Sequence, residues 1–392
     1  MTTAAKEPPA TAAAAPVAHE GLRDVVALES SICTVIGDAN LPEGRLIYRG
    51  YDIHELAEHS TFEETTYLLW HGNLPTRAQL DDLKRQLEQH RRLPDQLIEL
   101  MRRFPKEATP MDVLRTTVSA LQLWDSQEND DTDAANHAKA LRLTAQMPML
   151  VTAWDSIRVG KEPVAPKVGQ STARAFLYML TGQEPTDVAE RTLDIALILH
   201  ADHELNASTF AARVTAATLA DVHSSITSAI GALIGPLHGG ANEAVLHTLK
   251  EIGSIDRVEP YIMNKLNAHE KIMGFGHAVY RTRDPRATRL REMSRQLGES
   301  RGDLKYYEMS RKIEDAMMRE KGLNCNVDFY SASAYDALGV PMDLFTPVFA
   351  VSRISGWTAH VLEQYADNKL IRPRAQYVGQ RDRKYTSIEQ RA

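Results

Sequence analysis

Cysteine is scarce in this chain of 392 residues, which contains only Cys33 and Cys325. The two stand far apart and share no paired spacing, so the sequence predicts neither a disulfide framework nor a thiolate metal site. A reducing compartment follows as the simplest expectation, and we predict a cytoplasmic protein.

Long apolar runs are also missing. No stretch approaches the run of about 18 apolar residues that a membrane-spanning helix requires. The segment from Met1 to Pro16 is rich in Ala, Pro and Thr, and it has neither the apolar core of a signal peptide nor the arginines of a transit peptide. Such residues bury too little surface to offset the entropy of ordering, so we predict a disordered tail over residues 1–20.

Positive charge is not in excess. The chain carries 45 Lys and Arg against 52 Asp and Glu, a formal net charge of -7. A basic field of the kind that holds nucleic acid or an anionic membrane is therefore not expected. If the protein binds an anion, the cations that hold it must be gathered locally.

What the chain does contain is the pattern of a large helical protein. Hydrophobic residues make up 43% of it and charged residues 25%, enough for a sizeable core. Leu80, Leu83 and Leu87 lie at the three-to-four spacing of an amphipathic helix, and the same spacing recurs along the chain. Only Ser31–Ile36 and Arg45–Arg49 have strand composition, and the turn residues between them predict a β-hairpin.

Two pairs of residues have the spacing of a capping box at a helix N-terminus. They are Ser60 with Glu63, and Thr76 with Gln79. We expect a helix to begin after Ser60 and another after Thr76.

Four segments combine histidine or aspartate with Gly, Pro or Asn where a helix should begin or end. They are HADHELNAST (His200–Thr209), GPLHGGANE (Gly235–Glu243), GFGHAVYRTRDPR (Gly274–Arg286) and NVDFYSAS (Asn326–Ser333). One histidine at a helix end is most often only a satisfied polar residue. Four such segments in one chain point to a functional site.

His238 precedes a helical pattern, so we expect it near a helix N-terminus. The positive end of a helix dipole disfavours imidazolium, and a neutral imidazole there could donate a hydrogen bond to a developing oxyanion. Gly274 and Gly276 would let the backbone approach a ligand closely and leave amides free to contact it, although a Gly-x-Gly pattern alone has low specificity.

Several arginines stand near these segments or in apolar and Pro-containing contexts. They are Arg281, Arg283, Arg286, Arg353, Arg372 and Arg374. The guanidinium fork binds carboxylates in a bidentate manner, so arginines together with histidines indicate a di-acid substrate. For Arg281, Arg283 and Arg374, loose surface ion pairs remain an equal alternative.

A metal site is the main competing interpretation of the first segment. His200, His203 and Glu204 read H-x-x-H-E, which matches neither of the helical zinc motifs H-E-x-x-H and H-x-x-E-H. No third ligand is indicated by spacing, and we predict that no metal or other cofactor is required.

In this order and with these separations, the four segments resemble the citrate synthase family. The similarity runs from about Gly21 to the C-terminus, and SSICTVIGDANLPEGRLIYRGYDI near the start is similar to the short, prokaryotic-type members. The resemblance implies an all-α fold of two domains with a small N-terminal hairpin. It places a large domain at residues 21–223 and 335–392, and an inserted small domain, which closes as a lid, at residues 224–334.

The resemblance also implies roles for individual residues. The catalytic residues that it implies are His238, His277 and Asp328. The oxaloacetate-binding residues that it implies are His203, His277, Arg286, Arg353 and Arg372, and Arg372 would come from the partner subunit of a homodimer. Gly274, Phe275 and Gly276 are implied to contact coenzyme A. Acetyl-CoA is then a substrate, which condenses with oxaloacetate in the entry step of the tricarboxylic acid cycle, and citryl-CoA is hydrolysed to citrate.

Three alternatives stay open at this point. 2-Methylcitrate synthase uses the same residues on propionyl-CoA, but its members tend to read Y-A-E-H-E-F-N and L-D-W where this chain has HADHELN and NVDFY. A non-catalytic, ligand-sensing homologue would be expected to lose Asp328 or His238, and both are present. Citrate cleavage with ATP would need a phosphate loop that the sequence does not contain. We expect acetyl-CoA to give the higher kcat/KM, but the ratio of the two acyl preferences, any regulation and assembly beyond a dimer are not predicted.

Overall fold

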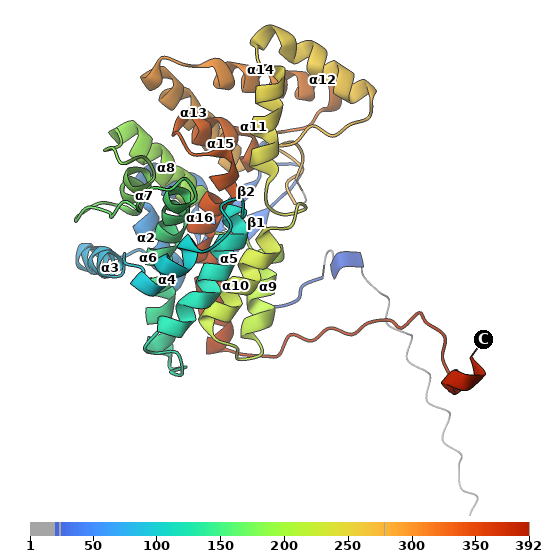
Figure 1. The fold of residues 1–392 in the computed structure, drawn as a ribbon. Helices are drawn as coiled ribbons and strands as arrows, with labels where there is room; N and C mark the ends of the chain where they lie inside the picture. The colour runs from blue at the N-terminus through green and yellow to red at the C-terminus, as the bar shows by residue number, and fades with distance from the viewer. Residues whose placement is uncertain (1–19, 23–24, 278, 392) are drawn as a thin grey trace, which may run out of the picture. The chain divides into compact units, whose positions relative to one another are not determined.

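The computed structural model describes residues 20–22, 25–277 and 279–391. These residues fall into two units that are described separately, Ser30–Leu370 and a second unit made of Met1–Glu29 with Ile371–Ala392. In the described part of the second unit, the regular elements are the short 3-10 helices η1 (Glu20–Leu22) and η5 (Ile388–Gln390) (Figure 1). Apart from Glu20, the disordered tail predicted over residues 1–20 lies outside the described residues.

Helices make up most of the regular structure of Ser30–Leu370, and the predicted all-α fold class is confirmed. In the described chain the first eight are α1 (Ile53–His59), α2 (Phe62–His71), α3 (Arg77–Gln89), α4 (Asp95–Arg102), α5 (Pro110–Leu121), α6 (Asp133–Arg158), α7 (Thr172–Thr181) and α8 (Asp187–His200). The others are α9 (Ala207–Ala216), α10 (Val222–Leu233), α11 (Ala241–Ile252), α12 (Val258–Asn267), α13 (Pro285–Arg301), α14 (Lys305–Lys321), α15 (Val327–Ala337) and α16 (Phe345–Ala366). Short 3-10 helices lie between them at η2 (Gln122–Trp124), η3 (Ile255–Arg257) and η4 (Met342–Leu344).

The predicted hairpin is present and gains a third strand. β1 (Cys33–Ile36) pairs antiparallel with β2 (Arg45–Tyr48), which in turn pairs with β3 (Tyr51–Asp52). Between β2 and β3, Arg49 has φ 48° and Gly50 has φ 92°. Positive φ at both central residues is the mark of a tight hairpin turn, which the strand pattern alone did not reveal.

One of the two predicted capping boxes is correct, and at the other helix the N-cap lies one residue later than predicted. Thr76 caps α3, and its hydroxyl and the Gln79 side chain bond reciprocally to each other's backbone. At α2 the cap is Thr61, whose hydroxyl accepts from the amide of Glu64, while Ser60 ends α1. Thr61 and Glu64 have the same three-residue spacing as the predicted pair, so the spacing alone could not distinguish the two positions.

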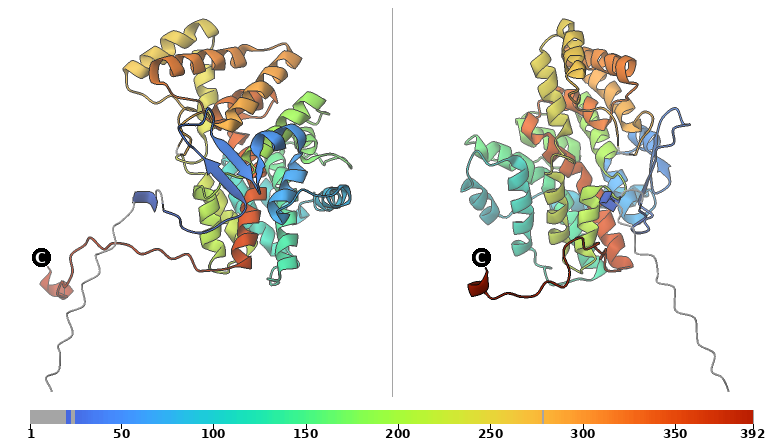
Figure 2. Two further views of the ribbon diagram at one scale, coloured as in Figure 1. Left: turned by 180° about the vertical axis from the view of Figure 1, so that it is seen from behind. Right: turned by 90° about the vertical axis from the view of Figure 1, so that its right-hand side faces the viewer.

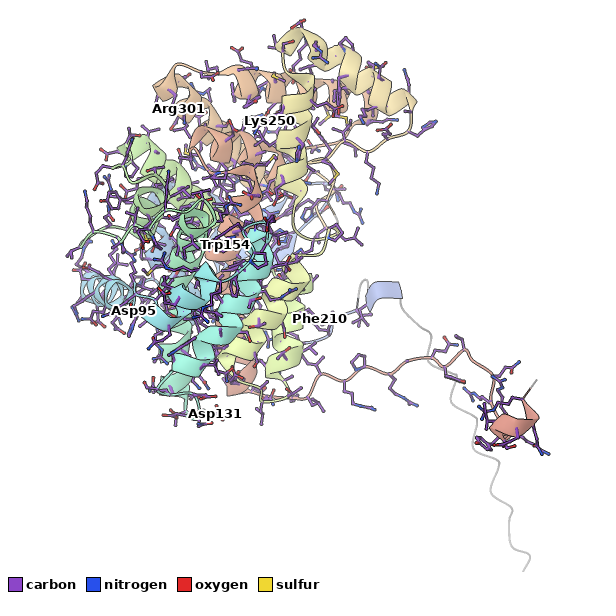
Figure 3. The ribbon with its side chains drawn as sticks, viewed as in Figure 1. Asp95, Asp131, Trp154, Phe210, Lys250 and Arg301 are labelled. Atoms are coloured by element: carbon purple, nitrogen blue, oxygen red, sulfur yellow. The ribbon has the colours of Figure 1, made fainter. Side chains whose placement is uncertain are left out.

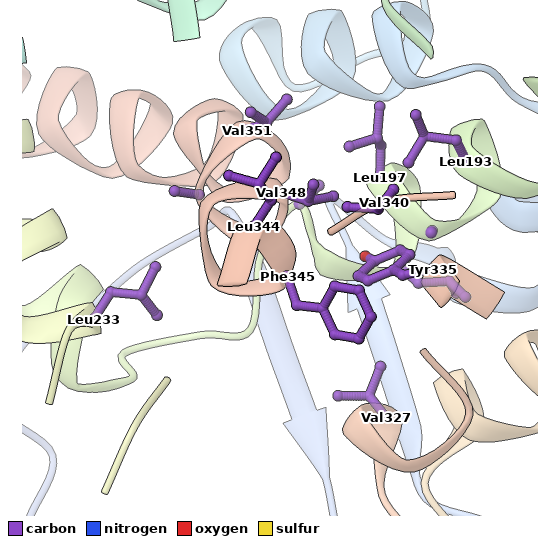
Figure 4. Packing of buried hydrophobic residues seen from close by; sticks show 14 of the residues in the cluster. Leu193, Leu197, Leu233, Val327, Tyr335, Val340, Leu344, Phe345, Val348 and Val351 are labelled. Atoms are coloured by element: carbon purple, nitrogen blue, oxygen red, sulfur yellow. The ribbon is translucent and has the colours of Figure 1, made fainter. Parts of the chain in front are cut away.

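Helix α16 is the centre of the core. It is buried along most of its length and contacts α2, α6, α8, α9 and α10. Figure 4 shows apolar side chains around its N-terminal end, among them Leu197 of α8, Tyr335 of α15 and Val348 of α16 itself. Truncating the fully buried Trp357 to alanine would cost about 3–5 kcal/mol. Despite this apolar character, none of the helices in the described ranges is long and apolar enough to cross a lipid bilayer.

A second group of helices packs around α15. α13 and α11 both contact α15, and α12 and α14 complete the group, as Figures 1 and 2 show. Figure 3 labels Lys250 on α11 and Arg301 at the end of α13; Lys250 lies 3.8 Å from the carboxylate of Asp336, and Arg301 donates to the carbonyl of Ala337. Helix α10, in which the predicted small domain begins, packs instead on α5, α9 and α16. α13 also contacts α1 and α8, which joins this group to the rest of the unit.

Candidate active site

Two glycines shape the loop that precedes His277. Gly274 has φ 84° and Gly276 has φ 79°, left-handed values that glycine adopts without strain. Gly274 is also closely packed, because a Cβ there would come within 2.8 Å of the side chains of Phe329 and Val245. An alanine at Gly274 would therefore meet both backbone strain and a steric clash.

Hydrogen bonds tie this loop to the residues before α15. The amide of Gly276 donates to the carbonyl of Asn324 at 3.0 Å, and the amide of Asn326 donates to the carbonyl of Gly274 at 2.9 Å. The amide of Gly276 is thus used within the chain, although the sequence suggested that these amides stay free for a ligand. The same bonds place the loop beside Asp328.

The imidazole of His277 is held in one protonation state. Its Nδ1 accepts hydrogen bonds from the amides of Val279 and Tyr280, both at 3.0 Å. An atom that accepts two N–H bonds carries no proton, so the ring proton sits on Nε2. Burial, with the positive charge of Arg286, lowers the pKa of His277 to about 4. At neutral pH His277 is therefore a neutral donor through Nε2.

His238 has the opposite tautomer. It lies just before α11, as predicted, yet the helix end that its ring contacts is that of α9. Its Nε2 is 3.3 Å from the amide of Ser208 in the first turn of α9 and 2.8 Å from the Ser208 hydroxyl. Since an amide can only donate, we assign the ring proton to Nδ1. Burial, followed by the charge of Arg353, lowers the pKa of His238 to about 4.

Asp328 stands in the first turn of α15. The N-cap side chain of Asn326 accepts from its amide at 3.1 Å. Burial raises the pKa of Asp328 to about 6 and Asp284 adds to the rise, while Arg286 and Arg353 oppose it. A carboxylate with a raised pKa is a stronger base than usual and is still ionised at neutral pH.

Arg286 is bound by its own helix cap. Its Nε and Nη2 donate to the two carboxylate oxygens of Asp284 at 3.0 and 2.8 Å, and both side chains are almost fully buried. Asp284 is also the N-cap of α13 and accepts from the amide of Val327 at 3.1 Å. The guanidinium is therefore fixed in direction, and its charge is already largely compensated.

Arg353, in the middle of α16, is less well satisfied. Its Nε donates to the carbonyl of His200 at 2.6 Å, and its guanidinium carbon lies 4.5 Å from the centre of the Phe349 ring. Its Nη1 is buried and has no hydrogen-bond partner among the described residues. A buried guanidinium N–H without an acceptor is costly, which suggests that an anionic ligand binds there.

His203 lies in the loop between α8 and α9 and faces the His277 loop. Its ring centre is 5.2 Å from that of His277, and its Nε2 is 3.2 Å from the hydroxyl of Tyr280. Burial, together with Arg286, His277 and Arg353, holds its pKa well below the ordinary value. It is therefore neutral.

The structure brings six predicted residues into one electrostatic neighbourhood: His203, His238, His277, Arg286, Asp328 and Arg353. Arg353 lowers the pKa values of His203, His238 and Asp328. Arg286 lowers those of His203, His277 and Asp328. The site thus holds three neutral imidazoles, one carboxylate and two guanidinium groups, a set suited to proton abstraction beside a bound di-acid.

Four other arginines are candidates from the sequence. Arg281 and Arg283 are exposed on the loop that follows His277. Arg372 and Arg374 belong to the second unit, in a stretch without regular structure, and both are exposed there. The role predicted for Arg372 therefore stays a prediction.

Three supporting residues were not singled out from the sequence. Asp284 orients Arg286, Ser208 fixes the tautomer of His238, and Tyr280 bonds to His203. The Asp-Pro pair of Asp284 is a recognisable helix-start signal, but nothing in the sequence links Ser208 to a histidine 30 positions away.

His200, considered above as a metal ligand, is buried at the end of α8. Its Nδ1 donates to the carbonyl of Ala196 at 2.8 Å, one turn back in the same helix. In the ranges that the structure describes, no three His, Cys, Asp or Glu side chains come together as a metal-binding group would require.

Comparison with known proteins gives a consistent result. Residues 21–374 match the family model described as "Citrate synthase, C-terminal domain". The chain is 53% identical over 376 residues to citrate synthase 2 of Bacillus subtilis, covering 96% of this chain and 100% of that protein, and 44% identical over 376 residues to the 2-methylcitrate synthase of Shewanella oneidensis, covering 95% and 97%. The solved ternary complex of citrate synthase from Thermoplasma acidophilum with carboxymethyl coenzyme A and oxalacetate has a TM-score of 0.86 and 34% identity, covering 95% of this chain and 99% of that one.

Proposed function

Because this chain belongs to the citrate synthase family, we propose that it condenses oxaloacetate with acetyl-CoA and hydrolyses citryl-CoA to citrate and coenzyme A. This acyl transfer, in which the acetyl group becomes an alkyl group of the product, is the entry step of the tricarboxylic acid cycle. We place the enzyme in the cytoplasm, since Cys33 and Cys325 are both free thiols.

One observation carries the proposal. His238 and His277 are both neutral, and in each ring one nitrogen is occupied by a backbone N–H, which leaves the other as a donor. Two preorganised neutral donors beside a carboxylate are what an enolisation followed by attack on a ketone requires.

Asp328 removes a proton from the methyl group of acetyl-CoA. A thioester methyl is a very weak acid, so the negative charge that moves onto the thioester oxygen must be stabilised as it forms. The Nδ1–H of His238 donates to that oxygen. A neutral imidazole suits this role because the acidity of its N–H is closer to that of the enol than the acidity of an imidazolium is.

The enolic carbon then attacks the ketone carbon of oxaloacetate. The Nε2–H of His277 donates to the ketone oxygen and stabilises the alkoxide that forms there. The alkoxide takes up a proton as Asp328 gives up the one it removed, which yields citryl-CoA and regenerates the base. Water then cleaves the thioester in the same site, its hydroxyl going to the acyl carbon and its proton to the sulfur, and citrate and coenzyme A are released. No step calls for a metal or a redox cofactor.

Oxaloacetate carries two carboxylates, and one chain supplies little free positive charge for them. Arg286 is compensated by Asp284, whereas Arg353 keeps a free N–H. We assign the substrate carboxylates to Arg286, Arg353 and His203, with a further cation from Arg372 of the second subunit of a homodimer.

The surface of α9 and α10 supports a homodimer. These helices pack on each other, and small residues such as Ala207 and Gly231 are exposed on them. A Cβ on Gly231 would meet nothing within 4 Å, so another helix has room to approach closely. A two-fold interface on this face would join two copies by the same patch.

The loop of Gly274, Phe275 and Gly276 contacts coenzyme A with those backbone groups that are not already used within the chain.

Helices α11–α15 move together as the lid. The lid starts nearer Ala241 than Ser224, because α10 packs into the helices around α16.

The function is tested by following free thiol released from acetyl-CoA in the presence and absence of oxaloacetate. Release should depend on oxaloacetate, and it should survive EDTA. Propionyl-CoA, the substrate of the 2-methylcitrate alternative, should give a lower kcat/KM than acetyl-CoA. Higher kcat/KM with propionyl-CoA would move the assignment to that enzyme, and inactivation by EDTA reversed by zinc would contradict the metal-free mechanism.

The shared site is tested by subunit mixing. Arg372→Ala and Asp328→Ala are each expected to be nearly inactive, and the two are unfolded and refolded together. If Arg372 acts across the dimer, each mixed dimer regains one intact site, so random assortment restores roughly a quarter of the wild-type activity. If mass spectrometry finds mixed dimers and no activity returns, Arg372 does not act in trans.

A further inference from the structure

Tyr280 contacts two of the residues assigned to oxaloacetate and lies near a third, yet it has no role in the proposed mechanism. It is only 4% exposed. Its ring centre lies 4.5 Å from that of His277 and 5.6 Å from that of His203, and its amide is one of the two donors to His277. The guanidinium of Arg286 lies 6.0 Å from the ring centre.

The Tyr280 hydroxyl determines which nitrogen of His203 carries the proton. Burial raises the pKa of this phenol far above its usual value, so the group is always protonated. Among the described residues its only hydrogen-bond partner is His203 Nε2, at 3.2 Å. A buried hydroxyl proton needs an acceptor, so Tyr280 donates and Nε2 accepts. The proton of the neutral His203 ring is therefore on Nδ1.

The N-terminal hairpin holds Tyr280 from the other side. A Cβ on Gly44 would overlap the ring of Tyr280, and one on Gly37 would overlap the carbonyl of Val279. The amide of Gly44 also donates to the carbonyl of Arg283 at 2.8 Å. Neither glycine has the positive φ that would explain its presence by backbone conformation. Close approach to the loop after His277 is the reason that these positions need glycine.

The contacts of Gly37 and Gly44 with the loop after His277, which we call the clamp, are held independently of the Tyr280 hydroxyl. The carboxylate of Glu43, next to Gly44, accepts from the hydroxyl of Thr288 at 2.5 Å and lies 2.9 Å from Nε2 of His54. Thr288 belongs to α13 and His54 to α1, so the hairpin is joined to both helices. Loss of the hydroxyl alone should therefore leave the clamp in place.

We propose that Tyr280 is a positioning residue for the binding of the keto-acid substrate. Its hydroxyl fixes His203 as an Nδ1–H donor, and the packing of Gly44 against its ring keeps that ring beside His203 and His277. The inference rests on the assignment of oxaloacetate to this site. It gives the N-terminal hairpin a part in substrate binding, although the hairpin contains none of the assigned substrate ligands.

The first test is Tyr280→Phe, which keeps the ring and the amide and removes only the hydroxyl. The KM for oxaloacetate should rise about tenfold, the value of one hydrogen bond together with a free choice of tautomer. The KM for acetyl-CoA should stay within about twofold, and kcat should fall less than the oxaloacetate affinity. Tyr365→Phe, which removes a hydroxyl bonded to the carbonyl of Ala220 at 2.6 Å, is the matched control and should leave all three constants unchanged.

A double-mutant cycle separates positioning from a general structural effect. If Tyr280 acts through His203, adding Tyr280→Phe to His203→Ala should change the KM for oxaloacetate by less than about twofold. An equal tenfold effect in both backgrounds would overturn the link to His203. An unchanged KM in the single variant would overturn the inference as a whole.

Gly44→Ala tests the clamp. The added methyl should displace the Tyr280 ring and raise the KM for oxaloacetate at least as much as Tyr280→Phe does. Wild-type kinetics in a folded Gly44→Ala variant would contradict the part assigned to the hairpin. Failure of the proposed function looks different, because the wild-type protein itself would then not release thiol in response to oxaloacetate.

Discussion

Helices α13 and α16 each bring one buried arginine to the same site, and the two arginines differ in how their charge is compensated. Arg286 on α13 shares both oxygens of Asp284, so its charge is compensated before any substrate arrives. Arg353 on α16 donates to a neutral carbonyl and keeps a buried N–H without a described partner. One arginine is therefore held within the structure of the site, and the other keeps an N–H that can bind a substrate carboxylate.

The largest effect on turnover is expected from substitution of Asp328, whose pKa both arginines lower. Asp328→Asn keeps the size of the side chain and removes the base, so kcat should fall by about 10² to 10⁴-fold. Oxaloacetate binding, followed by calorimetry, should be preserved because both arginines remain. Turnover close to that of the wild type would exclude Asp328 as the base.

Arg286→Gln should lower the free energy of unfolding as well as weaken oxaloacetate binding. It leaves the carboxylate of Asp284 buried without its partner, which costs about 3–5 kcal/mol of unfolding free energy. Denaturant unfolding measures this loss. The double variant Asp284→Asn with Arg286→Gln removes the unpaired charge and should regain part of the stability; no recovery would mean that the pair is not the cause.

Arg353→Gln should show the reverse pattern. The buried carboxylate of Asp202 loses a nearby charge but keeps its contact with His360, so the free energy of unfolding should fall less than in Arg286→Gln. Loss of a desolvated contact to a substrate carboxylate costs about 2 kcal/mol or more, equivalent to about thirtyfold in the KM for oxaloacetate. If Arg353→Gln were as unstable as Arg286→Gln, the contrast between the two arginines would be wrong.

The smallest effect concerns pH. Burial raises the pKa of Asp328 to about 6, and the base works only when ionised. The kcat/KM for acetyl-CoA should therefore rise as pH increases through about 6 and then level off. His238 and His277 have pKa values of about 4 and stay neutral over this range, so they cause no further change of kcat/KM with pH there. A plateau that extends unchanged down to pH 5 would contradict the raised pKa.

Stability should respond to the same groups with opposite signs. The folded-state pKa of Asp328 lies above its unfolded value, so this group stabilises the fold at low pH and loses that contribution as pH rises through about 6. For His238 and His277 the folded-state pKa values are lowered, so neutral rings favour the fold above about pH 6.5, and this contribution is lost as pH falls through about 4.

The amino-acid sequence by itself determined the helices, the hairpin and the segments that supply the site. Periodic leucines and caps such as Thr76 act over a few residues, so they can be read from a linear pattern. Helix boundaries were less certain, as the one-residue displacement from Ser60 to Thr61 shows.

Only the tertiary structure decided how the side chains are prepared for chemistry. The proton position on His238 depends on an amide of α9, and that on His203 depends on Tyr280, 77 positions away. Burial and the charge of Arg353 lower the pKa of His238, whereas the sequence argument relied on the dipole of the helix that follows it. Burial and long-range hydrogen bonds set these pKa values and tautomers, and neither has a signature in local sequence, because both depend on which distant segments meet when the chain folds.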